Sequence, residues 1–231
     1  MRVGLAGATT IATALVLTLT AASPVERPIT DSFERYTAGP LNEGTSFGPW
    51  SVTWDGYGSV AIAGHPKDQE LHLAPQTVTS PHETSAALVL SNYSLATCYT
   101  LRAELGLTEQ LRQGSPANPW ESPWLVWSYD NNDFYYLAMK TNGWEIGAHL
   151  ADLNPEQVFI ATGPAPFISE GDTVDVSVRL KNGVFRVRAN GQHLASFPSD
   201  LVHHDGHAGT VGFYTEDAAI TVDDVRTRTC R

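Results

Sequence analysis

Aromatic rings and charged side chains gather in one short stretch of the chain, residues 120–147. This stretch holds four of the six Trp and three of the eight Tyr, together with Glu121, Lys140 and Glu145. A flat aromatic face packs well against the C–H surface of a sugar ring, and its edge tolerates hydroxyl groups. The stretch therefore indicates a sugar-binding cleft, although aromatic cross-strand pairs that only stabilise a sheet would give a similar pattern.

Three charged residues of this stretch are the candidate catalytic groups. We expect Glu145 and Glu121 at the rim of the cleft as acid or base, with Lys140 beside them. A catalytic acid needs a raised pKa, and aromatic neighbours raise it by removing water from the carboxyl group.

The alternation of side chains assigns the other residues of this segment to two faces. Residues 134–140 are expected to form one strand of a hairpin, with Tyr135, Leu137 and Met139 in the core and Lys140 on the opposite face. Glu216 follows a late strand, at a corner where the edge of a ligand could lie. The side chains expected to contact substrate are Trp127, Tyr129, Tyr136, Trp144 and Glu216.

The elements that must position these residues are strands. Residues 173–180 read TVDVSVRL, in which apolar and polar side chains alternate as in a half-buried antiparallel strand. Asn182-Gly183 and Asn190-Gly191 follow, and Asn-Gly favours two-residue hairpin turns because both positions need positive φ. Residues 173–197 are therefore predicted to form a three-stranded meander.

Similar patterns predict strands along the rest of the chain, and no helical periodicity of useful length occurs after the first 22 residues. The class is therefore all-β, and the first and last strands are expected to pair. The further strands are expected at residues 50–54, 59–63, 70–73, 86–90, 99–105, 123–129, 134–140, 209–214 and 219–226.

The first 22 residues have the features of an export signal. Arg2 precedes an uncharged apolar run at residues 5–19, and small residues at 20–22 suit a signal peptidase. We therefore expect a signal peptide at residues 1–22, a single domain at residues 23–231, and a secreted monomer that has no membrane segment after cleavage. Loss of Arg2 changes the net charge from −11 to −12, which argues against nucleic acid as a partner.

The chain has two cysteines, Cys98 and Cys230. In an exported protein an even number of cysteines favours a disulfide, although two buried thiols are the alternative. Asn92-Tyr93-Ser94 is an N-glycosylation sequence, so Asn92 is a glycan acceptor if the host is a eukaryote.

Four segments together resemble the concanavalin A-like lectin and glucanase superfamily, which includes laminin-G-like domains. They are DSFERY near the start, WSYDNNDFYYLAMKTNGWEIG in the centre, the 173–197 meander, and GTVGFYTEDAAITVDDV near the end. The resemblance spans most of residues 29–226. It implies a two-sheet antiparallel jelly-roll sandwich whose ligands lie across the concave sheet, and a structural Ca²⁺ at Asp31 and Asp223.

The resemblance leaves the activity open. The Glu-x-Asp-x-Glu strand of retaining glucanases of this fold is absent from the sequence. Arg102-Ala103-Glu104 resembles a strand of jelly-roll alginate lyases, although a solvated cross-strand ion pair would look the same. The leading hypothesis is a secreted protein that binds and cleaves a polysaccharide, as a glycoside hydrolase or else as a lyase. The alternatives are a non-catalytic glycan-binding protein and a structural cell-surface protein.

Overall fold

The computed structural model describes residues 27–200 and 209–230, so the expected signal peptide at residues 1–22 lies outside the described residues. All the regular elements in the described ranges are β-strands, which confirms the predicted all-β class. Within these ranges, no helix has the length and apolar character needed to cross a membrane.

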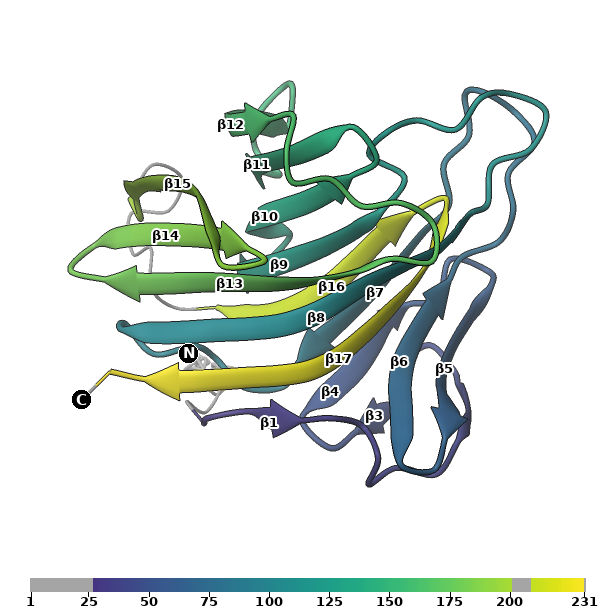
Figure 1. Ribbon diagram of the computed structural model, residues 1–231, viewed down its shortest axis with the longest axis horizontal. Coiled ribbons are helices and arrows are strands. Elements are labelled where there is room, and N and C mark those ends of the chain that lie inside the picture. The colour runs from purple at the N-terminus through teal and green to yellow at the C-terminus, as the bar shows by residue number, and fades with distance from the viewer. Residues whose placement is uncertain (1–26, 201–208, 231) are drawn as a thin grey trace, which may run out of the picture.

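The first of two antiparallel sheets has nine strands. Figure 1 shows its long strands β13, β8 and β17 side by side. The short strand β1 (Thr30–Asp31) joins the edge of β17 outside the main order. That order is β15 (Gln192–Pro198), β14 (Val184–Ala189), β13 (Thr173–Lys181), β8 (Tyr99–Gln110), β17 (Ala218–Thr229), β6 (Asp68–Ala74), β5 (Ser59–His65) and β2 (Gly39–Leu41).

The second sheet has eight strands and contains the aromatic centre of the sequence. In Figure 1 its strands β9, β10, β11 and β12 follow one another toward the top of the view, beyond β13 and β14. The order is β12 (Gln157–Gly163), β11 (Gly143–His149), β10 (Asp133–Lys140), β9 (Pro123–Asp130), β16 (Thr210–Glu216), β7 (Ala86–Ser91), β4 (Trp50–Trp54) and β3 (Ser46–Phe47). Two antiparallel sheets of this kind form the predicted jelly-roll sandwich.

One apolar core fills the space between the sheets. The alternating strand β13 buries Val174, Val176 and Val178 and exposes the residues between them. From the other sheet, Leu137 and Met139 are fully buried in the same core, as predicted. Burial of these side chains removes apolar surface from water, which is the main force that holds the two sheets together.

The chain ends meet as the sequence predicts. Asp31 of β1 pairs with Val225 of β17. Cys98 and Cys230 form a disulfide that closes a separation of 132 residues. The last strand is thus fixed both to the first strand and to the beginning of β8. Asn92 is exposed, and its side-chain amide bonds Ser51 and the carbonyl of Trp50.

Candidate functional site

A cleft of about 840 Å³ opens on the outer face of the eight-stranded sheet. Strands β9, β10, β11 and β16 form its floor, and the loop between β11 and β12 forms one wall. The lining residues are Trp120, Trp124, Phe134, Tyr136, Lys140, Glu145, His149, Leu153, Asn154, Pro155, Glu156, Gln157, Phe159, Tyr214 and Glu216.

Three aromatic rings make the floor of the cleft. Trp124 stacks on Tyr136 with ring centroids 4.6 Å apart, and it meets Tyr214 edge-on at 5.3 Å. The sheet register places Glu145, Ala138, Trp124 and Tyr214 side by side on neighbouring strands. Ala138 is fully buried, and Trp124 and Tyr136 are only 5% and 1% exposed, so these rings form the base of the cleft and present little surface to a ligand.

Tyr136 lies flat over β11 because Gly147 is opposite to it. A Cβ atom at Gly147 would come within 2.3 Å of the Tyr136 hydroxyl, so no larger residue fits there. The hydroxyl donates to Glu145 Oε1 at 2.9 Å and accepts from Gln157 Nε2 at 2.6 Å. Lys140 Nζ donates to Glu145 Oε2 at 3.1 Å. Both oxygens of Glu145 are therefore acceptors, as in an ionised carboxylate.

Glu216 has a different environment on the other side of the Trp124 ring. Burial raises the pKa of its carboxyl group, and the nearby carboxylates of Asp217 and Glu121 raise it further. The Tyr214 hydroxyl donates to Glu216 Oε1 at 2.7 Å, which acts in the opposite direction. The cleft thus has a hydrogen-bonded carboxylate on one side and, on the other, a carboxyl group that retains its proton to higher pH.

The rim of the cleft is apolar and exposed. Trp120 is 44% exposed, Leu153 is 47% exposed and Phe159 is 67% exposed. Such large apolar side chains in contact with water are available to stack on a ligand. His149 lies between them and the floor, stacked on Phe134 at 5.0 Å.

Hydrogen bonds fix the ring of His149 on both sides. Its Nδ1 lies 2.8 Å from the Asn132 carbonyl, and its Nε2 lies 3.0 Å from Glu156 Oε2. Both partners are acceptors, so both bonds form together only when the ring carries two protons.

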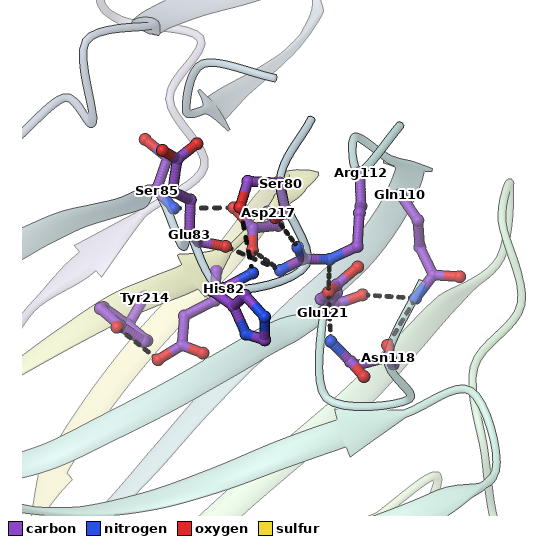
Figure 2. A network of polar contacts seen from close by, with 11 residues as sticks. Ser80, His82, Glu83, Ser85, Gln110, Arg112, Asn118, Glu121, Tyr214 and Asp217 are labelled. Atoms are coloured by element: carbon purple, nitrogen blue, oxygen red, sulfur yellow. Dashed lines mark hydrogen bonds and ion pairs between the residues drawn. The ribbon is translucent and has the colours of Figure 1, made fainter. Parts of the chain in front are cut away.

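A buried ionic network lies behind the cleft. Figure 2 shows Arg112 between the carboxylates of Glu121 and Asp217, with Asn118 and Ser80 bonded to the same groups. Arg112 bonds Glu121 Oε1 and Asp217 Oδ2, each at 2.5 Å. Glu121 has no exposed surface, so the prediction that it lies at the rim is wrong. A buried carboxylate was not expected here because its partner Arg112 lies in a loop that sequence patterns do not place.

This network positions two residues of the cleft. Glu121 directly follows the rim residue Trp120 in the chain, and Asp217 directly follows the cleft residue Glu216. Because Glu121 and Asp217 both bind the guanidinium of Arg112, they fix the positions of these two neighbours. Glu121 therefore supports the cleft without touching a ligand. Removing one member of a buried ionic group leaves an uncompensated charge and is strongly destabilising.

A β-bulge at Ser128 decides which aromatic rings face the cleft. Asp130 pairs with Asp133, whereas Trp127 pairs with Tyr135, so β9 carries one extra residue over this span. Ser128 takes that place with a φ of 53°. Because a one-residue shift moves every following side chain to the other face, Trp127 turns inward and Tyr136 faces outward.

Two further substrate-binding predictions are wrong, and a third residue lies beside the cleft rather than in its lining. Trp127 is fully buried and stacks on Tyr135 in the core at 6.0 Å. Trp144 is also buried in the core, and its Nε1 donates to the Ala165 carbonyl at 2.9 Å. Neither can contact a ligand. Tyr129 stacks on Phe134 at 5.6 Å and supports the floor from outside the lining.

Asp31 and Asp223 do not fit a shared Ca²⁺. Asp31 Oδ2 accepts hydrogen bonds from Trp50 Nε1, the Tyr36 hydroxyl and Arg35 at 2.6–2.9 Å, so a cation there would have to displace a guanidinium. Asp223 Oδ1 accepts the Asp224 amide at 2.6 Å. In residues 27–200 and 209–230, no group of three or more His, Cys, Asp or Glu is arranged to hold a metal ion.

The structure brings together four predicted residues and adds others that sequence reasoning missed. Tyr136, Lys140, Glu145 and Glu216 line one cleft. Sequence reasoning misses Trp124, because the bulge that places it beside Tyr136 cannot be read from the sequence. The rim residues come from loops, which carry no periodic signal. Arg102 and Glu104 lie on β8 in the other sheet, so they share no site with Tyr136 and Lys140.

Comparison with known proteins gives the fold. No protein-family model and no curated protein sequence matches the chain. Solved structures do match it in shape. The shared fold is a two-sheet antiparallel jelly-roll sandwich. The resemblance stated from the sequence is confirmed at this level.

Three solved structures illustrate the likeness. The carbohydrate-binding module CBM66 from Bacillus subtilis has a TM-score of 0.56 at 11% identity, over 78% of this chain and 96% of the module. The alginate lyase Aly36B has a TM-score of 0.57 at 13% identity, over 90% and 98% of the two chains. The lumenal domain of VIP36, described in a form bound to Ca²⁺ and Man3GlcNAc, has a TM-score of 0.53 at 10% identity, over 79% and 84%. At such low identity the likeness shows the fold alone.

Proposed function

We propose that this protein is secreted, binds a polysaccharide segment in the cleft of the eight-stranded sheet, and hydrolyses one of its glycosidic bonds. The observation that carries the proposal is the unequal pair of carboxyl groups, Glu145 and Glu216, on either side of an aromatic floor. Glycoside hydrolases use two carboxyl groups in two protonation states, and environments that differ in this way assign the two roles.

Glu216 is the proposed general acid. Its raised pKa keeps a proton available for transfer to the glycosidic oxygen as the bond from that oxygen to the anomeric carbon breaks. The Tyr214 hydroxyl, bonded to Oε1, orients the group.

Glu145 is the proposed general base. It takes a proton from a water molecule whose oxygen forms the new bond to the anomeric carbon. Strands β10 and β9 lie between β11 and β16, which separates the two backbones by about 14 Å. This spacing favours the wider, inverting arrangement, in which a water molecule fits beside the sugar. Lys140 and the Tyr136 hydroxyl hold the Glu145 carboxylate in place.

Elimination is less well supported by the same geometry. A lyase would need a side chain that removes the proton next to a uronate carboxyl group. Burial and the Glu145 charge raise the pKa of Tyr136 strongly, and its hydroxyl donates to Glu145, so Tyr136 is a poor base.

Substrate binding relies on the exposed rim in this proposal. Trp120 and Phe159 stack on sugar rings, and Gln157 bonds a hydroxyl group between them. The known proteins of similar shape include a carbohydrate-binding module, an alginate lyase and a lumenal domain bound to mannose-containing glycan, which supports a carbohydrate ligand. The disulfide supports an oxidising, extracellular location.

The test is a screen of polysaccharides for new reducing ends, with wild type, Glu216→Gln and Glu145→Gln. Each variant should lose activity by about 100-fold or more, because general acid or base catalysis contributes about that much. Glu109→Gln is the matched control, since Glu109 is an exposed carboxyl group on β8 of the other sheet. Glycan binding with no new reducing ends would instead identify a glycan-binding protein, and products with the ultraviolet absorbance of an unsaturated uronate would identify a lyase.

A further inference from the structure

The outer face of the nine-stranded sheet carries half of the chain's basic residues. The sequence contains 14 Lys and Arg in a protein of net charge −11. Seven of these lie on four neighbouring strands, β14, β13, β8 and β17, and all seven are exposed. We call them the basic face: Arg102, Arg179, Lys181, Arg186, Arg188, Arg226 and Arg228.

The sheet register arranges the basic face in two parallel rows that cross the strands. Neighbouring strands are about 4.8 Å apart, and the two rows are about 7 Å apart because they lie two residues apart along each strand. The first row is Arg226, Arg102, Ser177 and Arg188, and the second is Arg228, Thr100, Arg179 and Arg186.

Like charges face each other directly in both rows. Arg102 pairs with Arg226 in the register, and Arg179 pairs with Arg186. Cross-strand pairs of like charge destabilise a sheet. In the part of the chain that the structure describes, the side chains of Arg102, Arg179, Arg186 and Arg228 make no hydrogen bond or ion pair. This repulsion is a cost to the fold that a bound anion would remove.

Small hydroxyl residues separate the guanidinium groups and leave hollows between them. Ser177 and Thr100 occupy the centres of the rows. A hollow of about 530 Å³ lies among Thr100, Arg102, Ser177, Arg179, Arg186 and Arg188, with Asp175 at its border. A second, of about 300 Å³, continues past Arg226 and Arg228 and is also lined by Asp175 and Asp224. Guanidinium walls above a hydroxyl floor fit a carboxylate or sulfate group, which arginine binds through two parallel hydrogen bonds.

We propose that the basic face is a second carbohydrate site, which binds an acidic polysaccharide through its carboxylate or sulfate groups. The site lies on the sheet opposite to the cleft and does not depend on the hydrolysis proposed there.

The shape of the charged area favours a single extended chain as the ligand. An acidic row borders the basic face on one side, because Asp223, Glu104 and Asp175 pair across β17, β8 and β13. The positive area is therefore a narrow strip that runs across the strands. A nucleic acid duplex would place phosphates over the acidic row. A polysaccharide chain laid along the rows meets one strand about every 4.8 Å, close to the length of one pyranose residue.

The test is binding of the disulfide-bonded protein, without residues 1–22, to immobilised polygalacturonate, heparin and neutral dextran at low and high salt. We expect binding to at least one polyanion and none to dextran, with affinity that falls as salt rises. Binding to polygalacturonate assigns carboxylates as the ligand groups, and binding to heparin alone assigns sulfates. Arg179→Gln with Arg188→Gln should weaken binding about tenfold or more.

Two controls make the result specific. Lys67→Gln removes one exposed charge in the turn between β5 and β6, away from the basic face, and should change the affinity less than about twofold. The Arg179→Gln, Arg188→Gln protein should melt at the wild-type temperature or above, since the change relieves like-charge repulsion. Glu216→Gln should bind the polyanion normally, which separates this site from the cleft.

Three results would overturn the proposal. They are no binding to either polyanion at low salt, equal binding by the wild type and the double arginine variant, and a salt-sensitive dimer that the double variant abolishes. The last result would mean that the basic face pairs with the acidic row of a second copy.

Discussion

At the scale of single residues, the main feature of the cleft is that Glu145 and Glu216 have different environments. Glu145 has a hydrogen-bond donor on each oxygen, and one of them is the Lys140 amine. Glu216 is buried beside Asp217 and Glu121, and its pKa is raised. In the proposed reaction, these fixed neighbours rather than any short sequence motif would divide the acid and base roles between the two carboxyl groups.

This difference predicts the pH dependence of hydrolysis. The reaction needs Glu216 protonated, so kcat/KM should fall as pH rises through the raised pKa of Glu216. Measuring kcat/KM from acid to alkaline pH should show this fall on the alkaline side. A profile that stays flat on the alkaline side would remove Glu216 as the acid.

A second carboxyl group with a shifted pKa predicts the pH dependence of stability. Burial, then the charges of Asp224, Glu34 and Glu70, raise the pKa of Asp223 from 3.8 to about 6. A raised pKa means that the folded protein holds this proton more tightly than the unfolded chain. Its contribution to stability is therefore present below about pH 4 and is lost as pH rises through about 6.

Asp223→Asn should therefore weaken the fall in melting temperature between pH 4 and pH 7. Glu109→Gln, an exposed carboxyl group on β8, is the control. If wild type and Asp223→Asn lose the same number of degrees over this range, the Asp223 proton does not contribute.

At the scale of elements, the bulge at Ser128 matters more than any single contact. It turns Trp127 into the core and leaves Trp124 and Tyr136 together on the outer face. Glycine at 209 allows the partner strand to pass, since a Cβ there would come within 2.6 Å of the Ser128 backbone. The aromatic centre of the sequence thus serves two layers: a core on one side and the cleft floor on the other.

The two layers should respond in opposite ways to removal of a Trp ring. Trp127→Ala should reduce the free energy of unfolding by about 3–5 kcal/mol, because it leaves a cavity in a packed core. Trp120→Ala should cost less than about 1 kcal/mol, since that side chain is 44% exposed, but should weaken glycan binding. Denaturant unfolding checks the first and glycan titration the second. A harmless Trp127→Ala would mean that the faces of β9 are assigned wrongly.

The sequence predicts this hairpin correctly wherever its side chains alternate regularly between the two faces of the sheet. Alternation correctly places Leu137 and Met139 in the core and Tyr136 and Lys140 in the cleft. It fails at Trp127, because a bulge is one extra residue with no periodic signature. It fails at Glu121, because burial of this carboxylate depends on Arg112 in the same loop, and a loop has no periodic pattern.

At the scale of the whole molecule, contacts between distant parts of the sequence hold the sandwich together. The predicted pairing of the first and last strands and the predicted disulfide are both present, and they are predictable because the strands alternate clearly and two cysteines can form only one pair. The order of strands within each sheet and the loop wall of the cleft depend on long-range packing, which a single sequence does not show.

The disulfide should make a large contribution to stability because it closes a long loop. Cys98→Ser with Cys230→Ser, across a separation of 132 residues, should reduce the free energy of unfolding by up to about 5 kcal/mol in the chain-entropy model. Denaturant unfolding of the double variant beside wild type measures the loss. A loss below about 1 kcal/mol would show that the strand pairing of β17 already fixes the chain end.

The central claim is that the cleft on the eight-stranded sheet holds the glycan. Hydrogen–deuterium exchange, measured with and without a saturating oligosaccharide identified by the polysaccharide screen, tests it most directly. We predict slower exchange at Trp120 and along residues 150–159, which form the rim and wall of the cleft. No change there, with protection confined to β8, β13 and β14 of the other sheet, would contradict the account.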